Sequence, residues 1–65
     1  MEISDFIKEL RRELCYSQLD LAKAIKVTEQ TVRRWEHGES NPRYVSMRKL
    51  NALCETMHLK RHSER

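Results

Sequence analysis

The stretch that decides the fold is QLDLAKAIKVTEQTVRRW, residues 18–35. Its apolar residues fall into two short groups at helical spacing, Leu21 to Ile25 and Val32 to Trp35. A residue that favours helix starts precedes each group, Ser17 the first and Thr28 the second. The pattern predicts two short helices joined by a tight turn, the second running from about Thr28 to Glu36.

Further helices are expected on both sides of this pair. Before it, the stripe Ile3, Phe6/Ile7, Leu10 and Leu14 predicts an amphipathic helix with Ser4 as its N-cap. After it, Gly38 is expected to stop the second helix of the pair. A last helix is predicted from about Arg43, with its apolar face formed by Met47, Leu50, Leu53/Cys54 and Met57. Residues 1–59 then form one domain, and residues 60–65 form a polar, basic and frayed tail.

Length and composition favour an all-α fold. A chain of 65 residues has room for one small core. One glycine and one proline leave little for the many turns of an all-β fold. Cys15 and Cys54 lie outside metal-binding spacings, so we expect reduced thiols that pack as small hydrophobes, no metal and no cofactor. No signal peptide, lipidation motif or long apolar run is present, which predicts a cytoplasmic protein without membrane contact.

Positive charge gathers in the second half of the chain. Lys and Arg number 13 against 10 Asp and Glu, whereas residues 1–27 carry five of each sign. The excess of +3 therefore follows Thr28, and clustered charge of this kind suits a polyanion. No nucleophile–base spacing or glycine-rich phosphate loop is present, and the domain is too small for a substrate pocket, so an enzyme is not expected.

The outer face of the second helix carries side chains that can read bases. At 100° per residue, Gln30 and Arg34 lie opposite Val32, with Thr31 and Arg33 beside them. Gln can form a bidentate contact with adenine, Arg with guanine, and Glu can accept from cytosine. A plain αα-corner with a solvated charged face stays open as the alternative at this point.

The chain resembles the Cro and phage-repressor-like (XRE) helix-turn-helix family over residues 6–53. The match is carried by Ser17-Gln18-x-x-Leu21-Ala22, Ile25, Val27-Thr28, Thr31-Val32, Trp35-Glu36-x-Gly38 and Pro42. This resemblance implies a fold of four or five helices, with helices 2 and 3 forming the DNA-reading motif. It also implies a transcriptional regulator that binds double-stranded DNA as a homodimer on a two-fold operator.

Roles for individual residues follow from helix geometry and from this resemblance. The expected base-reading residues are Glu29, Gln30, Thr31 and Arg34. The expected phosphate contacts are Gln18, Arg11, Thr28, Arg33, Arg43 and Lys26. The resemblance further implies that Arg11 pairs with Glu36, and that Gln18 braces Gln30.

Two positions depart from the family pattern. Lys26 stands between the two helices where the family usually has glycine, at a cost of about 1 kcal/mol if the turn stays left-handed. Residues 54–57 look able to continue the last helix where the family often has a break. The leading hypothesis is a repressor that reads the major groove. The alternative is an antitoxin-like or adaptor module that binds a protein partner through the same fold.

Overall fold

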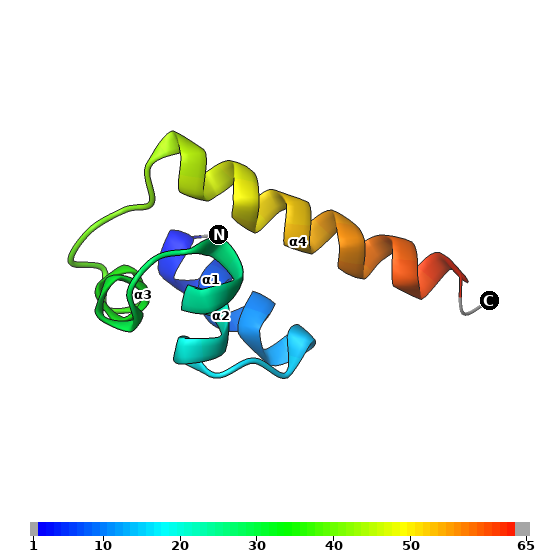
Figure 1. Ribbon diagram of the computed structural model, residues 1–65, viewed down its shortest axis with the longest axis horizontal. Coiled ribbons are helices and arrows are strands. Elements are labelled where there is room, and N and C mark those ends of the chain that lie inside the picture. The colour runs from blue at the N-terminus through cyan, green and yellow to red at the C-terminus, as the bar shows by residue number, and fades with distance from the viewer. Residues whose placement is uncertain (1, 64–65) are drawn as a thin grey trace.

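The protein folds into four α-helices and a set of short connections. The computed structural model describes the backbone of residues 2–63 and the side chains of residues 2–56. The helices are α1 (Ile3–Leu14), α2 (Gln18–Ile25), α3 (Glu29–Glu36) and α4 (Tyr44–Ser63). No strand occurs among residues 2–63, so the all-α prediction is confirmed. Figure 1 shows α4 as a long helix along one side of a compact group formed by α1, α2 and α3.

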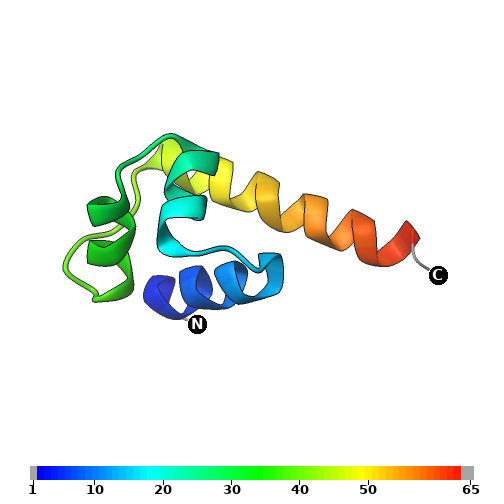
Figure 2. The ribbon, with the colours of Figure 1, turned by 60° about the horizontal axis from the view of Figure 1, so that its bottom comes forward.

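The core lies where all four helices meet. α3 packs against both α1 and α2, and α4 packs against α2. Figure 2 shows α2 between α1 and α4. The buried residues are Ile7, Leu10, Leu21, Ala22, Ile25, Val32, Trp35 and Leu50. Each of them belongs to an apolar face that helical spacing predicts. These faces are buried because removing apolar surface from water stabilises an amphipathic helix in the fold.

Two of the three predicted N-caps are confirmed. The Ser17 hydroxyl accepts from the backbone N–H of Asp20, whose carboxylate accepts in return from the N–H of Ser17, each at 3.0 Å. The Thr28 hydroxyl caps α3 by accepting from the N–H of Thr31. The prediction for Ser4 is wrong. The N-cap lies two residues earlier, at Glu2, so that α1 begins at Ile3, and the Glu2 carbonyl accepts from the N–H of Phe6 at 2.9 Å.

Three successive helices end in the same left-handed turn. The residues with positive φ are Cys15 (59°), Lys26 (61°) and Gly38 (77°). After each helix a backbone N–H reaches back five residues, from Tyr16 to Arg11, Val27 to Ala22 and Glu39 to Arg34, each at 2.9 Å. This is the hydrogen bond of a Schellman motif, which glycine enters most easily. Lys26 therefore keeps the left-handed turn of the family, and Cys15 adopts the same conformation unexpectedly.

The last helix is longer than expected. α4 runs without a break past residues 54–57, as the sequence predicted. It also includes residues 60–63, which were expected to be frayed, while residues 64–65 lie outside the described part. The predicted core role of Met57 falls among side chains that the structure does not describe. Within the described residues, no helix is both long and apolar enough to cross a membrane.

Candidate nucleic-acid interface

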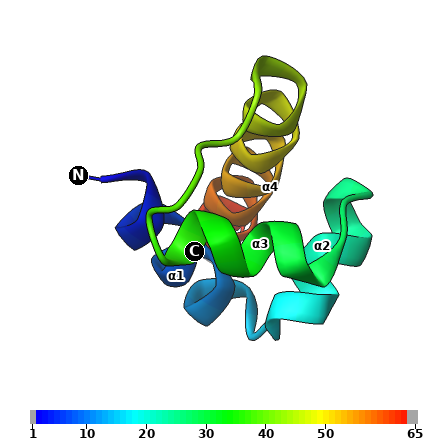
Figure 3. The ribbon, with the colours of Figure 1, turned by 90° about the vertical axis from the view of Figure 1, so that its left-hand side faces the viewer.

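α3 presents one face to the core and the other to solvent. Val32 is fully buried, and Trp35 and Glu36 are 4% and 7% exposed. Four of its side chains are exposed on the other side: Glu29, Gln30, Arg33 and Arg34. Figure 3 looks onto this helix, which crosses the front of the molecule with no other helix before it. The exposed face of α3 is therefore free to enter a groove.

A buried carboxylate joins the three N-terminal helices. Arg11 of α1 donates to Glu36 at the end of α3 through two nitrogens, Nε to Oε2 at 2.6 Å and Nη2 to Oε1 at 3.1 Å. Gln18 at the start of α2 donates from Nε2 to the same Oε1 at 3.0 Å. A third Arg11 nitrogen, Nη1, donates to the carbonyl of Tyr16 at 3.2 Å. The pair expected from the family resemblance thus lies in direct contact.

This network keeps Glu36 ionised. Burial acts to raise the pKa of the Glu36 carboxyl. The hydrogen bonds from Arg11 and Gln18 and the positive charges of Arg11 and Lys8 lower this pKa, and their combined effect is the larger one. The net result is a pKa below the ordinary value, because a carboxylate that accepts charge-assisted hydrogen bonds is favoured over its acid. Glu36 is accordingly a structural residue at the C-terminal end of α3, buried and held by Arg11 and Gln18.

Gln18 differs from the expectation in one respect. Its amide donates to Glu36, and no hydrogen bond joins it to Gln30, whose side chain is exposed. The sequence could not distinguish the two partners, since both lie on α3, at opposite ends of the helix. Gln18 therefore stabilises the C-terminal end of α3 and leaves Gln30 unrestrained.

The two threonines at the start of α3 are paired. Their hydroxyl oxygens lie 2.7 Å apart, and the Thr28 oxygen also accepts from the N–H of Thr31. Thr28 is exposed, whereas Thr31 is half-buried at the edge of the exposed face of α3. The hydroxyl of Thr31 thus has a partner within the protein, and its methyl group is held in one orientation.

Lys49 contacts the turn between α2 and α3, a role that the sequence analysis missed. Its Nζ donates to the carbonyl of Ile25 at 3.2 Å, across 24 positions of sequence. Ile25 is the last residue of α2, where unsatisfied carbonyls carry the negative end of the helix dipole. Helical periodicity gives no clue to this bond, because it depends on how α4 crosses α2. Lys26, next in the chain, remains exposed.

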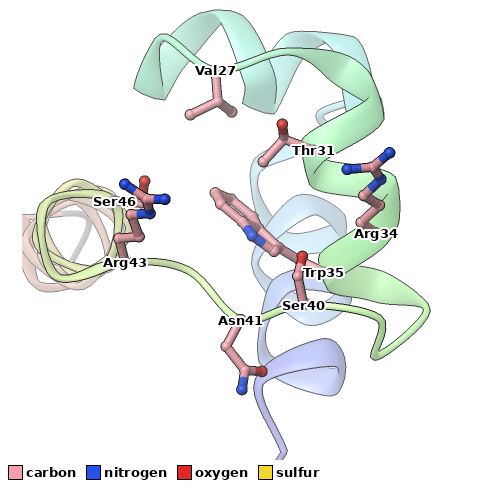
Figure 4. A pocket seen from close by; sticks show the side chains of 8 residues that line it. All are labelled: Val27, Thr31, Arg34, Trp35, Ser40, Asn41, Arg43 and Ser46. Carbon is pink, nitrogen blue, oxygen red and sulfur yellow. The ribbon is translucent and has the colours of Figure 1, made fainter.

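Arg43 lies at the rim of a cleft between α3 and α4. The cleft has a volume of about 340 Å³, and its lining residues are Val27, Thr31, Arg34, Trp35, Ser40, Asn41, Arg43 and Ser46. We call it the α3–α4 cleft (Figure 4). Trp35, which ends the second apolar group of the sequence, is buried in the core, but it also forms part of this lining.

The described residues offer no assembled metal site. Among residues 2–56 no three His, Cys, Asp or Glu side chains come together in a suitable group. Both cysteines are free thiols. Cys54 is half-buried and packs against the core, but Cys15 is exposed in its left-handed turn, so the prediction that it packs as a small hydrophobe is wrong.

Comparison with known proteins agrees with this geometry. A family model described as helix-turn-helix matches residues 7–56, which include α2, α3 and the turn between them. The chain therefore belongs to the XRE-type helix-turn-helix family. It is 38% identical over 42 residues to the HTH-type transcriptional regulator DicA of Escherichia coli (strain K12). That match covers 65% of this chain but only 31% of the relative. No solved structure matched the chain.

Proposed function

We propose that this chain binds duplex DNA in a sequence-specific manner and regulates transcription, with α3 in the major groove. The observation that carries the proposal is the division of α3 into a fixed face and a free face. Val32, Trp35 and Glu36 hold the helix, while Gln30 and Arg34 are exposed and make no hydrogen bond within the described residues. A helix that is rigid and polar on its outer face is what direct readout of base edges requires.

The predicted contacts divide by role. Glu29, Gln30, Thr31 and Arg34 are proposed to face bases, with Thr31 offering chiefly its methyl group because Thr28 occupies its hydroxyl. Gln18, Thr28, Arg33, Arg43 and Lys26 are proposed to approach phosphates. Arg11 already uses three of its N–H donors inside the protein. We therefore propose that its main role is to hold Glu36 and that contact with the DNA backbone is secondary.

Repression by a homodimer is the finer part of the proposal. Binding as a homodimer would place two copies of α3 on one operator, and it predicts half-sites about one helical turn apart. We propose a cytoplasmic location and a binding role rather than a catalytic one. DicA is named a transcriptional regulator, which supports the same class of function for the shared segment.

Selection of binding sites from a random pool of duplex DNA tests the proposal. A palindromic consensus is expected for a homodimer, and an enriched but asymmetric site would contradict only the dimer. Binding should weaken steeply as salt rises, since each neutralised phosphate releases counterions. Absence of enrichment, together with no association with random duplex at low salt, would contradict DNA binding.

The alternative is an antitoxin-like or adaptor module that binds a protein partner. The observation that favours it is Glu29, an exposed acid in the first turn of α3, on the helix proposed to approach the DNA phosphates. A Glu29→Gln variant separates the two. On the DNA proposal it should raise affinity for random duplex while relaxing sequence preference, because a repulsive carboxylate is removed. Unchanged DNA binding would count against any role of Glu29 in readout.

A further inference from the structure

The α3–α4 cleft is lined by groups that donate hydrogen bonds. Figure 4 shows the ring of Trp35 lying across it from α3 toward α4, with Arg43 and Ser46 on the α4 side and Ser40 and Asn41 on the loop. The hydroxyl of Thr31 is already hydrogen-bonded to that of Thr28. The other polar side chains of the lining form no hydrogen bond within the described residues. The cleft therefore offers several free donors at once.

Trp35 supplies the least expected of these donors. Its side chain is almost wholly buried, yet its indole Nε1–H donates to no group among residues 2–56. Since no fully buried side-chain nitrogen or oxygen of these residues lacks a partner, this N–H has to lie where solvent reaches it. Figure 4 places the ring nitrogen on the edge that faces the loop, beside Ser40. A buried indole usually has a partner for its N–H, so this one is available to a ligand.

The charge of the lining selects the ligand class. Arg34 and Arg43 are its only ionisable members, and both are cations. Arg34 extends from α3 on the side away from Arg43, so Arg43 is the cation on the α4 side of the ring (Figure 4). The neighbouring hollow, which shares Trp35 and Asn41, contains Glu2 and is unsuited to an anion. The lining offers cationic and neutral donors and contains no carboxylate that would repel an anion. Such a lining suits a phosphate, which presents several acceptor oxygens.

We propose that the α3–α4 cleft binds one phosphate group, with the indole N–H of Trp35 and the guanidinium of Arg43 as its main donors. Ser40 and Ser46 supply further hydroxyl contacts. Assigning this phosphate to the backbone of duplex DNA rests on the function proposed above. Trp35 then acts in two ways, since its ring holds α3 in the core and its N–H fixes the register of α3 on the duplex.

The indole N–H can be observed directly, because Trp35 is the one tryptophan of the chain. In a uniformly ¹⁵N-labelled sample, its resonance is followed during titration with inorganic phosphate and, separately, with a random-sequence duplex at low salt. We expect a saturable downfield shift of the indole proton with the duplex. A shift with inorganic phosphate alone would instead identify a free phosphate as the ligand of the same site.

Arg43→Gln should reduce this shift, whereas Arg12→Gln, which removes an exposed cation of α1, should leave it unchanged. If the duplex shifts the backbone amides of α3 and leaves the indole unmoved, the phosphate site is overturned while DNA binding stands. If neither titrant moves the indole and no duplex binds, both proposals fail. If inorganic phosphate moves it and no duplex binds, only the proposed function fails.

Affinity gives an independent check. Trp35→Phe keeps an aromatic ring but removes the N–H, and should weaken duplex binding roughly 10-fold. Because the lost donor is neutral, the slope of log K against log salt should not change, while Arg43→Gln should reduce that slope by about 0.9. A folded Trp35→Phe variant that binds as tightly as the original chain would overturn the contact. Should this variant fail to fold, the titration of the original chain still decides.

Discussion

Arg11 and Glu36 form a bidentate ion pair between the last turn of α1 and the last residue of α3, with N–O distances of 2.6 and 3.1 Å. The side chain of Glu36 is 5% exposed and that of Arg11 24% exposed. The pair therefore acts in a partly dry environment, where an unpaired carboxylate is costly. Because α3 is only 8 residues long, this contact and the packing of Val32 and Trp35 set its position.

Arg11→Met should destabilise the protein by about 2–3 kcal/mol, below the ~3–5 of a fully buried pair because solvent reaches Arg11. The loss arises mainly from Glu36, which would stay buried with only Gln18 as a donor. Urea unfolding followed by circular dichroism measures it, with Arg12→Met as the control. The double variant Arg11→Met/Glu36→Met should lose less than the sum of the two single losses. Additive losses would mean that the pair contributes nothing as a pair.

The free energy of unfolding should decrease as the pH falls into the acid range, because Glu36 is then protonated. The pKa of Glu36 is lower in the folded chain than the ordinary 4.5, so its contribution is complete above about that pH and is lost as pH falls toward the folded pKa. Asp20 acts in the same direction, since hydrogen bonds from the backbone and side chain of Ser17 lower its pKa. Urea midpoints measured from neutral pH downward should decline less in Glu36→Gln than in a Glu9→Gln control. Parallel declines in the two variants would contradict this assignment.

The sequence predicted much of the fold because helical periodicity and capping are local. Ser17, Thr28 and Gly38 mark boundaries through their own backbone preferences. Cys15 carries no such preference, so its left-handed turn could not be read from the chain. Contacts between helices depend on packing angles, which explains why Gln18 was expected at Gln30 and why Lys49 was missed. The unpaired N–H of Trp35 likewise becomes visible only once the loop is placed.

Lys26→Gly should stabilise the protein by about 1 kcal/mol, because glycine adopts the left-handed conformation without the steric cost that a side chain pays there. Cys15→Gly should give a similar and additive gain, since the two turns end different helices. Thermal unfolding measures both, and Lys26→Ala serves as the control that removes the charge but keeps the strain. A gain in Lys26→Ala equal to that in Lys26→Gly would assign the effect to charge instead.

Lys49→Met should weaken the contact between α4 and the end of α2. The expected loss is about 1 kcal/mol of stability, the usual contribution of one hydrogen bond, because the carbonyl of Ile25 loses its donor. Amide hydrogen exchange should show faster exchange at Lys26 and Val27, whose N–H groups close the turn. Lys23→Met, which removes an exposed cation of α2, should leave these amides protected. Equal effects of both variants would contradict a specific role for Lys49.

Arg34 and Arg33 offer the sharpest test of how α3 reads DNA, because they are adjacent, exposed and identical in chemistry. Arg34→Ala should reduce affinity for the selected site by about 1–3 kcal/mol and relax preference at one position, as expected for a base contact. Arg33→Ala should weaken binding to all sequences alike and reduce the salt slope by about 0.9, as expected for a phosphate contact. Binding is measured on the selected site and on single-base variants of it. If the two variants lose affinity without any change in sequence preference, α3 contacts only the backbone, and the assignment of Arg34 to bases is wrong.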